Sequence, residues 1–332
     1  RYSGNSYKRI VNMLIFSMQL LGRDILTRNP DVVIDSSTYP LTIWGSRKIA
    51  KRFNAKLIFE VHDLWPLTPM ELGGYSRWHP FIFVLQQAEN YAYKNADRVV
   101  SLLPCAKEHM ISHGMHAEKF VYIPNGIDLH EWQVTESLSA EHNIVIKQLK
   151  AQGKFIVGYA GSIGLSNALE YFIEAADLLK NEKSLHFILV GQGPNLEQLK
   201  ATAVARSLEN VTFLPPVQKK QIPMLFSLMD ALHIAGNRSA LYRFGISPNK
   251  LMEYMMAAKP IINAICAGND PVAEAGCGLS IAPEDPTAIV RAVKQIMAMS
   301  PKDRAAMGER GRAYVMANHD YRVLAKRFLE CI

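Results

Sequence analysis

The stretch FIVGYAGSIGLSNALEYFIEAADLLKNEKSLHFILVGQGP, residues 155–194, contains one complete strand–helix–strand unit. Apolar runs at 155–159 and 186–190 flank an amphipathic segment. Two buried strands joined by a crossover helix are typical of a parallel sheet. Each strand is followed by a glycine loop, first Gly158–Gly164 and then 191–194, and such loops let a backbone approach a phosphate closely.

The same alternation of short β-branched runs and longer amphipathic segments extends along the chain, which predicts an α/β fold. Strands are expected at 31–34, 56–61, 98–102 and 120–123, and then at 155–159, 186–190, 211–214, 231–234 and 260–262. We therefore expect two Rossmann-like, doubly wound domains facing a cleft, with ligands beyond the carboxyl ends of the strands. The predicted segments are an N-terminal domain over 1–135, a C-terminal domain over 136–310, and a helix over 311–332 that packs back toward the first domain.

The start of the chain lacks the opening unit of such a domain. Residues 1–30 contain a polar start, without an initiator Met, and one apolar, helix-like run at 10–26. We therefore expect the N-terminal domain to be incomplete at its start. Loss of a strand would expose sheet edges, so we also expect this domain to be prone to aggregation.

Charge and cysteine content narrow the function classes. Lys and Arg outnumber Asp and Glu by 37 to 30, a formal charge of +7, which favours an anionic partner. The four cysteines are scattered, so neither a zinc module nor a disulfide framework is indicated, and a reducing compartment such as the cytoplasm fits. We find no D-x-D motif and no His/Asp/Glu cluster at metal-ligand spacing, so no metal is expected.

The segment from Phe244 to Ile262 reads as loop, helix, loop and strand. Ser247 can cap the helix and Pro248 fits its first turn, so backbone N–H groups there could hold a diphosphate. Lys250 adds a positive charge, and Glu253 lies on nearly the same face, where a carboxylate could accept two ribose hydroxyls. An ordinary capped helix with a surface Lys–Glu pair fits the same spacing.

A second candidate follows the strand that ends at Val61. His62 and Asp63 lie at its carboxyl end, where Asp63 could orient the imidazole ring through a hydrogen bond. Taken from the residues alone, a His-Asp pair at this position is more often structural than catalytic.

These motifs together resemble the GT-B glycosyltransferases of family 4, which are retaining enzymes that use nucleotide-sugar donors. The matching residues are Pro124-Asn125-Gly126-Ile127-Asp128, the Gly158–Gly164 loop, Gly191-Gln192-Gly193-Pro194, and Ser247-Pro248-Asn249-Lys250 with Glu253-Tyr254-Met255. The segments 59–66 and 71–74 are most similar to WbuB-type enzymes, assigned as fucosamine transferases of bacterial surface polysaccharide pathways.

The resemblance implies roles for named residues. Catalysis is assigned to His62 and Asp63, and donor binding to Gly161, Ser162, Gly191, Gly193, Arg243, Ser247, Asn249, Lys250 and Glu253. Two family features are missing: the acid expected eight positions before Glu253 is Gly245, and a Lys-Gly pair is replaced by Asn167-Ala168. Lys250, Arg243 or Arg238 would then neutralise the donor diphosphate. The resemblance further implies a retaining transfer by front-face attack, without a metal.

The implied partners are a nucleotide sugar, with UDP favoured, and a lipid-diphosphate-linked saccharide acceptor; no nucleic acid is expected. Apolar residues at 10–22 and the aromatic residues Trp65, Trp78, Phe81 and Phe83 could contact the inner face of the plasma membrane, although core packing explains both sets. We expect residues 1–332 to bind nucleotide but, because the first domain is incomplete, to transfer no sugar. A sugar-nucleotide 2-epimerase of the same fold and a non-catalytic nucleotide-binding subunit are the alternatives.

Overall fold

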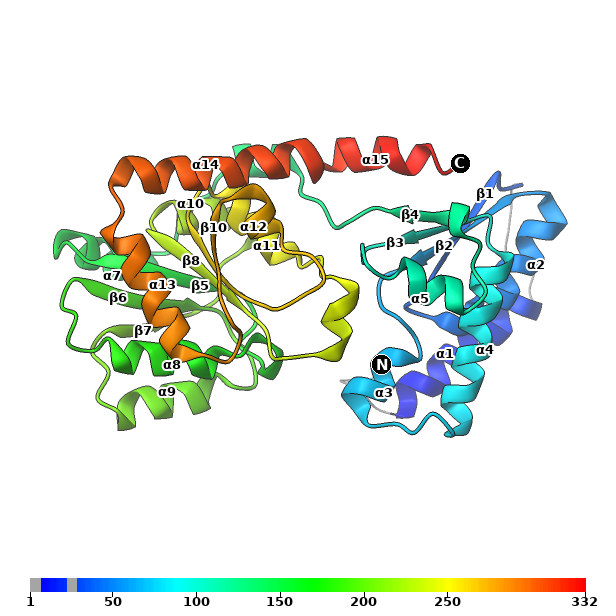
Figure 1. Ribbon diagram of the computed structural model, residues 1–332, viewed down its shortest axis with the longest axis horizontal. Helices are drawn as coiled ribbons and strands as arrows, with labels where there is room; N and C mark the ends of the chain where they lie inside the picture. Colours follow the sequence, from blue (N-terminus) through cyan, green and yellow to red (C-terminus); the bar gives the residue numbers. More distant parts are fainter. Residues whose placement is uncertain (1–6, 23–28) are drawn as a thin grey trace. The chain divides into compact units, whose positions relative to one another are not determined.

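The computed structural model describes residues 7–22 and 29–332, which form two compact units (Figure 1). Unit 1 comprises Arg1–Pro124, Ala240–Ser247 and Leu324–Ile332, and unit 2 comprises Asn125–Ser239 and Pro248–Val323. Each unit has its own parallel sheet, so the predicted α/β class is confirmed.

Unit 1 is built on a four-stranded parallel sheet in the order β1-β2-β3-β4. Its strands are β1 (Val32–Ser36), β2 (Lys56–Val61), β3 (Arg98–Ser101) and β4 (Phe120–Tyr122). Its helices are α1 (Tyr7–Gly22), α2 (Ile43–Phe53), α3 (Leu67–Gly73), α4 (Pro80–Asn95) and α5 (Lys107–Ser112). Leu57 and Phe59 point into the core shared with α2, α4 and α5, while Ile58 packs on the opposite face against Leu324.

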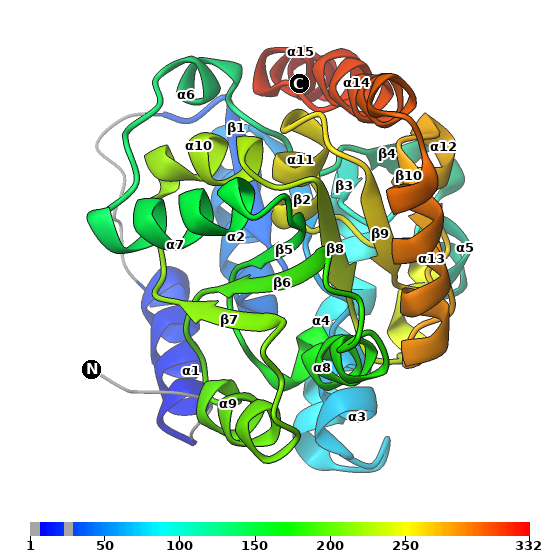
Figure 2. The same ribbon diagram turned by 90° about the vertical axis from the view of Figure 1, so that its left-hand side faces the viewer.

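Unit 2 contains a six-stranded parallel sheet in the order β10-β9-β8-β5-β6-β7 (Figure 2). The strands are β5 (Phe155–Ala160), β6 (Leu185–Val190), β7 (Val211–Leu214), β8 (Ala231–Ala235), β9 (Ile261–Ala264) and β10 (Gly278–Ser280). The strand order reverses direction between β5 and β8. In doubly wound sheets the crevice at this reversal is where ligands bind.

Helices cover both faces of the second sheet because successive strand residues point to opposite sides. The helices of unit 2 are α6 (Leu129–Gln133), α7 (Ala140–Ala151), α8 (Leu169–Leu178), α9 (Leu196–Ala205), α10 (Ile222–Ser227), α11 (Asn249–Met256), α12 (Pro271–Ala275), α13 (Pro286–Ala298) and α14 (Pro301–Asn318). Helix α15 (Tyr321–Leu329) follows, and its residues from Leu324 onward belong to unit 1. Ile156 packs toward α7, α10 and α11, whereas Val157 packs toward α8 and α13. The single turns of 3-10 helix are η1 (Pro40–Thr42), η2 (Ala117–Lys119), η3 (Leu165–Asn167), η4 (Lys219–Gln221) and η5 (Ala240–Phe244).

The nine predicted strands are confirmed within one or two residues, but several elements escaped prediction. Helix α7 lies in a segment for which the sequence analysis names no element, because only a narrow face, with Ile146 and Leu149, is buried on an otherwise polar helix. Strand β10 has only three residues, too few for a periodic pattern. The expected helix at 10–26 corresponds to α1, and residues 23–26 lie outside the described part of the chain.

The unit boundaries differ from the predicted divisions at 135 and 310. The first division falls after Pro124, and unit 1 takes back two later segments, 240–247 and 324–332. Helix α14 packs on α11 in unit 2, while Phe328 in the last helix packs on the sheet of unit 1. These assignments depend on contacts between residues far apart in sequence, which a linear pattern does not reveal.

Two apolar surfaces of unit 1 are exposed. In α1, Met13 and Ser17 are buried, but Phe16 and Met18 are 49% and 69% exposed. Trp78 is 80% exposed and Phe83 is 61% exposed, so core packing is the wrong explanation for these two aromatic residues. Among the described residues, no helix combines the length and apolar character needed to cross a membrane.

Candidate functional site

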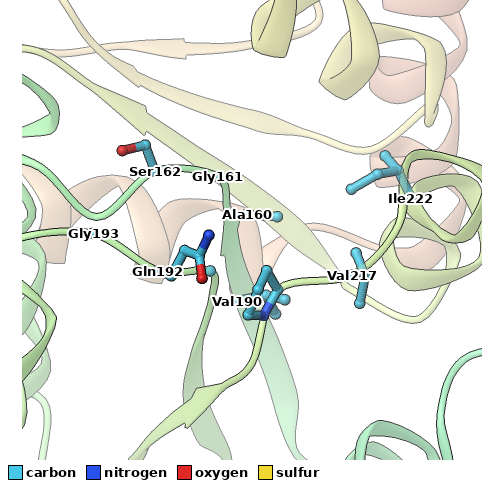
Figure 3. Close-up of a pocket in the computed structure, with 10 residues that line it drawn as sticks. Ala160, Gly161, Ser162, Val190, Gln192, Gly193, Val217 and Ile222 are labelled. Atoms are coloured by element: carbon cyan, nitrogen blue, oxygen red, sulfur yellow. The ribbon is translucent and has the colours of Figure 1, made fainter. Parts of the chain in front are cut away.

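A cavity of about 450 Å³ lies in unit 2 at the carboxyl ends of neighbouring strands (Figure 3). The loops after β5, β6 and β7 form its walls, which consist of Ala160, Gly161, Ser162, Val190, Gly191, Gln192, Gly193, Pro216, Val217 and Ile222. The structure thus brings four of the predicted donor-binding residues together: Gly161, Ser162, Gly191 and Gly193.

The two glycine loops are joined through their backbones. The N–H of Gly161 donates to the carbonyl of Val190 at 2.9 Å, and the N–H of Ile163 donates to the carbonyl of Gln192 at 2.8 Å. A Cβ atom at Gly191 would lie 1.9 Å from the Gly161 carbonyl oxygen, and one at Gly193 would lie 2.3 Å from the Ile163 oxygen. Both positions also have positive φ, so only glycine fits where the loops meet.

The far wall of the cavity was missed by the sequence analysis. Val217 and Ile222 lie across from Ser162 and Gln192 in Figure 3. Pro216 and Val217 follow the carboxyl end of β7, so the rule that located the glycine loops applies to them as well. They escaped because only glycine-containing loops were considered. The cavity therefore combines an apolar wall with a wall of exposed backbone, as ligand pockets commonly do.

Lys250 reaches the edge of this cavity from the first turn of α11. Its ammonium donates to the Tyr159 hydroxyl at 2.6 Å and to Asn167 Oδ1 at 3.1 Å. The side chain passes so close to Gly161 that a Cβ atom there would lie 2.7 Å from Lys250 Cε. Tyr159 and Asn167 account for two of the three ammonium protons, which leaves capacity for a phosphate oxygen.

The contact with Asn167 bears on the missing Lys-Gly pair. Ala168 adopts φ +48°, a left-handed conformation that glycine reaches more easily than alanine. Asn167 has no charge, but it holds the ammonium of Lys250. A positive charge is therefore present beside the position where the family has its lysine.

Glu253 lies one turn further along α11 and is partly buried. Burial raises the pKa of its carboxyl group, and the charges of Lys219 and Lys250 oppose that shift. Lys219 also pairs with Glu131. Lys219 lies in the chain between Val217 and Ile222, which line the cavity. The Glu253 carboxylate is therefore influenced by a positive charge from the segment that forms the apolar wall.

The other predicted donor ligands have different surroundings. Ser247 does not cap α11: the helix begins at Asn249, Pro248 occupies the cap position and no side chain caps it. The helix begins later than expected because Pro248 has an extended backbone (ψ 127°), which places Ser247 outside the helix. Asn249 is the first helical residue, and its role in donor binding stays a prediction.

Neither arginine proposed for diphosphate neutralisation lines the cavity. Arg243 belongs to unit 1, where its guanidinium lies over the Phe244 ring at 4.4 Å and donates to the Ala240 carbonyl. Arg238 pairs with Glu284 at 3.6 Å. Of the three cations named from the sequence, Lys250 is the one that the structure places at the cavity edge.

His62 in unit 1 has a different partner from the one predicted. Its Nε2 atom lies 3.1 Å from Glu60 Oε2, and this hydrogen bond is the main cause that raises the pKa of His62. The prediction that Asp63 orients the ring is therefore wrong. Residues two apart at the end of a strand share a face, so Glu60 lies beside His62, while Asp63 lines a narrow pocket with Trp65.

Ser37, at the carboxyl end of β1, fixes the backbone of this loop. Its hydroxyl oxygen accepts hydrogen bonds from the N–H groups of His62 at 2.9 Å and Asp63 at 3.4 Å. Ser37 is 2% exposed, so the contact is shielded from water. The sequence analysis missed Ser37 and Glu60 because neither belongs to a recognisable motif.

Replacing Lys250 by Met is expected to weaken UDP binding by roughly 1.5–3 kcal/mol, the range for a hydrogen bond to a charged group. Burial lowers the pKa of Lys250 to about 8. The ammonium is charged below this pH and neutral above it, so UDP affinity should fall as the pH rises through 8. Calorimetric titrations from pH 6.5 to 9.5 measure this, and Lys250→Met should abolish the dependence.

Uridine, which has no phosphate, should bind equally to the parent and to Lys250→Met. Lys259→Met is the matched control, because Lys259 is another partly buried lysine, bonded to the Ser227 carbonyl and absent from the cavity lining. Equal losses of uridine and UDP affinity in Lys250→Met would contradict a role in phosphate binding and indicate a folding defect.

Sequence comparison gives two family matches that together span nearly the whole chain. Residues 141–314 match the model for glycosyl transferases group 1, and residues 1–131 match the model for glycosyltransferase family 4. WcaI of Escherichia coli strain K12, assigned as a colanic acid biosynthesis glycosyl transferase, is 25% identical over 295 residues, which cover 87% of this chain and 70% of WcaI. WbjE of Pseudomonas aeruginosa, assigned as a glycosyltransferase, is 22% identical over 98% of this chain and 79% of its own.

Solved structures show the same fold. HepE of Anabaena, crystallised with UDP, superimposes with a TM-score of 0.71 at 17% identity over 96% of this chain and 80% of its own. Sucrose-phosphate synthase from Thermosynechococcus elongatus superimposes with a TM-score of 0.74 at 17% identity. The match covers 99% of this chain and 79% of the synthase chain. With two Rossmann-like units and a family model matched over more than half of its length, the chain belongs to the glycosyl transferases group 1 and has the GT-B fold.

Proposed function

We propose that this glycosyltransferase moves a sugar from a UDP-sugar, with retention of anomeric configuration, to a lipid-diphosphate-linked saccharide in bacterial surface polysaccharide synthesis. The observation that carries the donor assignment is the cavity of unit 2, where two interlocked glycine loops meet the Lys250 side chain. Backbone loops that approach closely, together with a cation, are suited to a diphosphate. The HepE structures, solved with UDP and with UDP-glucose, support the choice of nucleotide.

In this proposal the leaving diphosphate is stabilised by Lys250 and by the start of α11, without a metal ion at that position. Charge develops on the diphosphate as the sugar departs, so a preorganised cation lowers the barrier. Unit 1 supplies His62 for the transfer step, and the leaving diphosphate oxygen accepts the proton of the acceptor hydroxyl. A donor of the fucosamine class follows from the likeness to WbuB-type enzymes.

The acceptor class rests on two observations. WcaI, a relative, is assigned to colanic acid biosynthesis, which supports a polysaccharide pathway. Unit 1 also exposes Phe16 and Met18 on α1, and Trp78 before α4, with the Arg77 guanidinium 4.6 Å from the Trp78 ring centre. Aromatic and cationic side chains on an exposed apolar surface are suited to a lipid–water interface. We therefore propose that unit 1 contacts the membrane that carries the acceptor.

A donor panel tests the proposal. Saturation-transfer binding is measured with UDP-, GDP- and dTDP-sugars, including an N-acetylfucosamine donor. Transfer is then followed with a lipid-linked and a free saccharide, with and without EDTA, and the anomeric configuration of the product is determined. We expect UDP-sugar binding and transfer to the lipid-linked acceptor, and EDTA should not change the rate of this transfer.

Each alternative gives a different result. Donor consumption without an acceptor would favour a sugar-nucleotide epimerase, and nucleotide binding without turnover would favour a non-catalytic subunit. Inversion of configuration would exclude the retaining mechanism.

A further inference from the structure

Three metal-ligating side chains meet in unit 1, outside the donor cavity of unit 2. Glu89 comes from α4 and His109 from α5, and His113 directly follows α5. One ligand atom from each lies within 4.8 Å of the other two. The donor cavity belongs to unit 2, so this cluster is a separate feature.

His109 offers a buried nitrogen. Its Nε2 atom is shielded from solvent and has no hydrogen-bond partner within the described residues. Its ring packs against the ring of His113, with centres 4.3 Å apart, and against Phe244, with centres 5.1 Å apart. Buried polar atoms in proteins nearly always have a partner. The unpartnered nitrogen of His109 therefore indicates that a ligand binds to it.

His113 has the arrangement typical of a metal ligand. Its Nδ1 atom lies 2.8 Å from the His109 carbonyl oxygen, which can only accept. Nδ1 therefore carries the proton, and the Nε2 atom of the neutral ring presents its lone pair. Metal-bound histidines usually donate their second ring N–H to a carbonyl or carboxylate in this way, which fixes the tautomer and the ring orientation.

Glu89 supplies a carboxyl group that is already oriented. Oε1 accepts from the Tyr93 hydroxyl at 2.9 Å, and Oε2 accepts from Gln86 Nε2 at 2.9 Å. The residue is 4% exposed, and burial raises the pKa of its carboxyl group to about 8, so a neighbouring cation is needed to favour the ionised form.

We propose that Glu89, His109 and His113 bind one Zn²⁺ ion. Two imidazoles and a carboxylate are a common zinc donor set, whereas Mg²⁺ prefers oxygen ligands alone. Tetrahedral zinc with bonds of roughly 2.0–2.1 Å holds its ligand atoms about 3.3 Å apart, so the side chains must close by small rotations from their present separation. Water would complete the coordination.

The site would act as a structural brace. Phe244, which packs on His109, is also held by the Cys105 N–H, which donates to its carbonyl at 3.0 Å. Phe244 ends η5, directly before the segment that leads into α11, which holds Lys250 and Glu253. An ion that joins α4 to α5 would therefore stiffen the surface on which this segment of unit 1 rests.

The expectation of no metal was drawn from spacing along the sequence, whereas Glu89, His109 and His113 come together only in the fold. His109 and His113 are four residues apart, which is the spacing of two ligands on one helix face. The pair was overlooked because its third member, Glu89, lies on another helix and contributes through tertiary packing.

Metal binding to the purified, chelator-treated protein tests the proposal directly. Zn²⁺ is titrated in competition with a chromophoric chelator, and Co²⁺ is added separately to read the coordination geometry from its visible spectrum. We expect one equivalent of Zn²⁺ and the strong absorption of tetrahedral Co²⁺. His109→Ala and His113→Ala should each weaken Zn²⁺ binding by more than about 100-fold, beyond the loss typical of an outer-shell partner.

His116→Ala is the matched control, because His116 is exposed, lies three residues beyond His113 and is absent from the cluster. This variant should bind Zn²⁺ like the parent. Circular dichroism establishes that each variant is folded, and Zn²⁺ should raise the melting temperature of the parent but not of the His109 and His113 variants. Absence of a stoichiometric equivalent, or undiminished binding by the folded His113→Ala protein, would overturn the proposal.

Discussion

Replacing His62 by Ala is expected to lower the turnover number of the enzyme by about 10²- to 10³-fold, the range for loss of a group that stabilises charge developing in the transition state. The dissociation constant for UDP should stay unchanged, because His62 belongs to unit 1 and the donor cavity belongs to unit 2. Steady-state kinetics and calorimetric titration measure the two quantities separately. Unchanged turnover would show that His62 is structural.

Glu60 offers a sharper test of the same residue. Its hydrogen bond is the main cause that raises the pKa of His62, and the Asp63 charge contributes less. In Glu60→Gln the pKa of His62 should fall, so the limb of the pH–rate profile that reports His62 should move to lower pH. Asp63→Asn should move it less. An unmoved limb in Glu60→Gln would mean that another group controls the profile.

The second large effect is expected at Glu253. Substitution by Ala should weaken UDP binding by about 2–4 kcal/mol, because a charged acceptor of two ribose hydroxyls is lost. Burial raises the pKa of this carboxyl group, while Lys219 and Lys250 oppose the shift and favour the charged form that accepts both bonds. Isothermal titration of UDP against parent and variant measures the difference.

A ligand lacking both ribose hydroxyls makes this test specific. The 2′,3′-dideoxy analogue of UDP should bind the parent about as weakly as UDP binds Glu253→Ala, and the two changes together should add little. Glu131→Gln is the control, because Glu131 pairs with the same Lys219 but carries no assigned role. If both losses add in full, Glu253 does not contact the ribose.

Much of the fold could be predicted because burial and periodicity are local properties. The β5 strand reads as a continuous apolar run since both of its faces are covered, by α8 on one side and α7 on the other. The glycine loops could be found for a related reason. Gly191 lies where two backbones touch and no side chain fits. The sequence shows a glycine at this position.

What could not be predicted depends on contacts between distant segments. The Lys250 ammonium could be expected at the helix start, but its anchors, Tyr159 and Asn167, lie more than eighty residues earlier. His62 pairs with Glu60 and not with Asp63 because of the way the strand ends. The periodicity of the sequence does not show this. Glu89 looks like an ordinary helix residue until α5 packs beside it.

The division of the chain has a consequence for chimeric enzymes. The backbone passes between the two units after Pro124, Ser239, Ser247 and Val323, so neither unit corresponds to a single half of the gene. A hybrid made by one crossover, with the second half taken from a relative, would bring in a foreign η5 and a foreign α15. Both would then have to fit the first sheet of another protein. A hybrid that keeps the core of unit 1 intact must therefore exchange all three of its segments together. These segments are defined by their contacts with one another and not by their order along the gene.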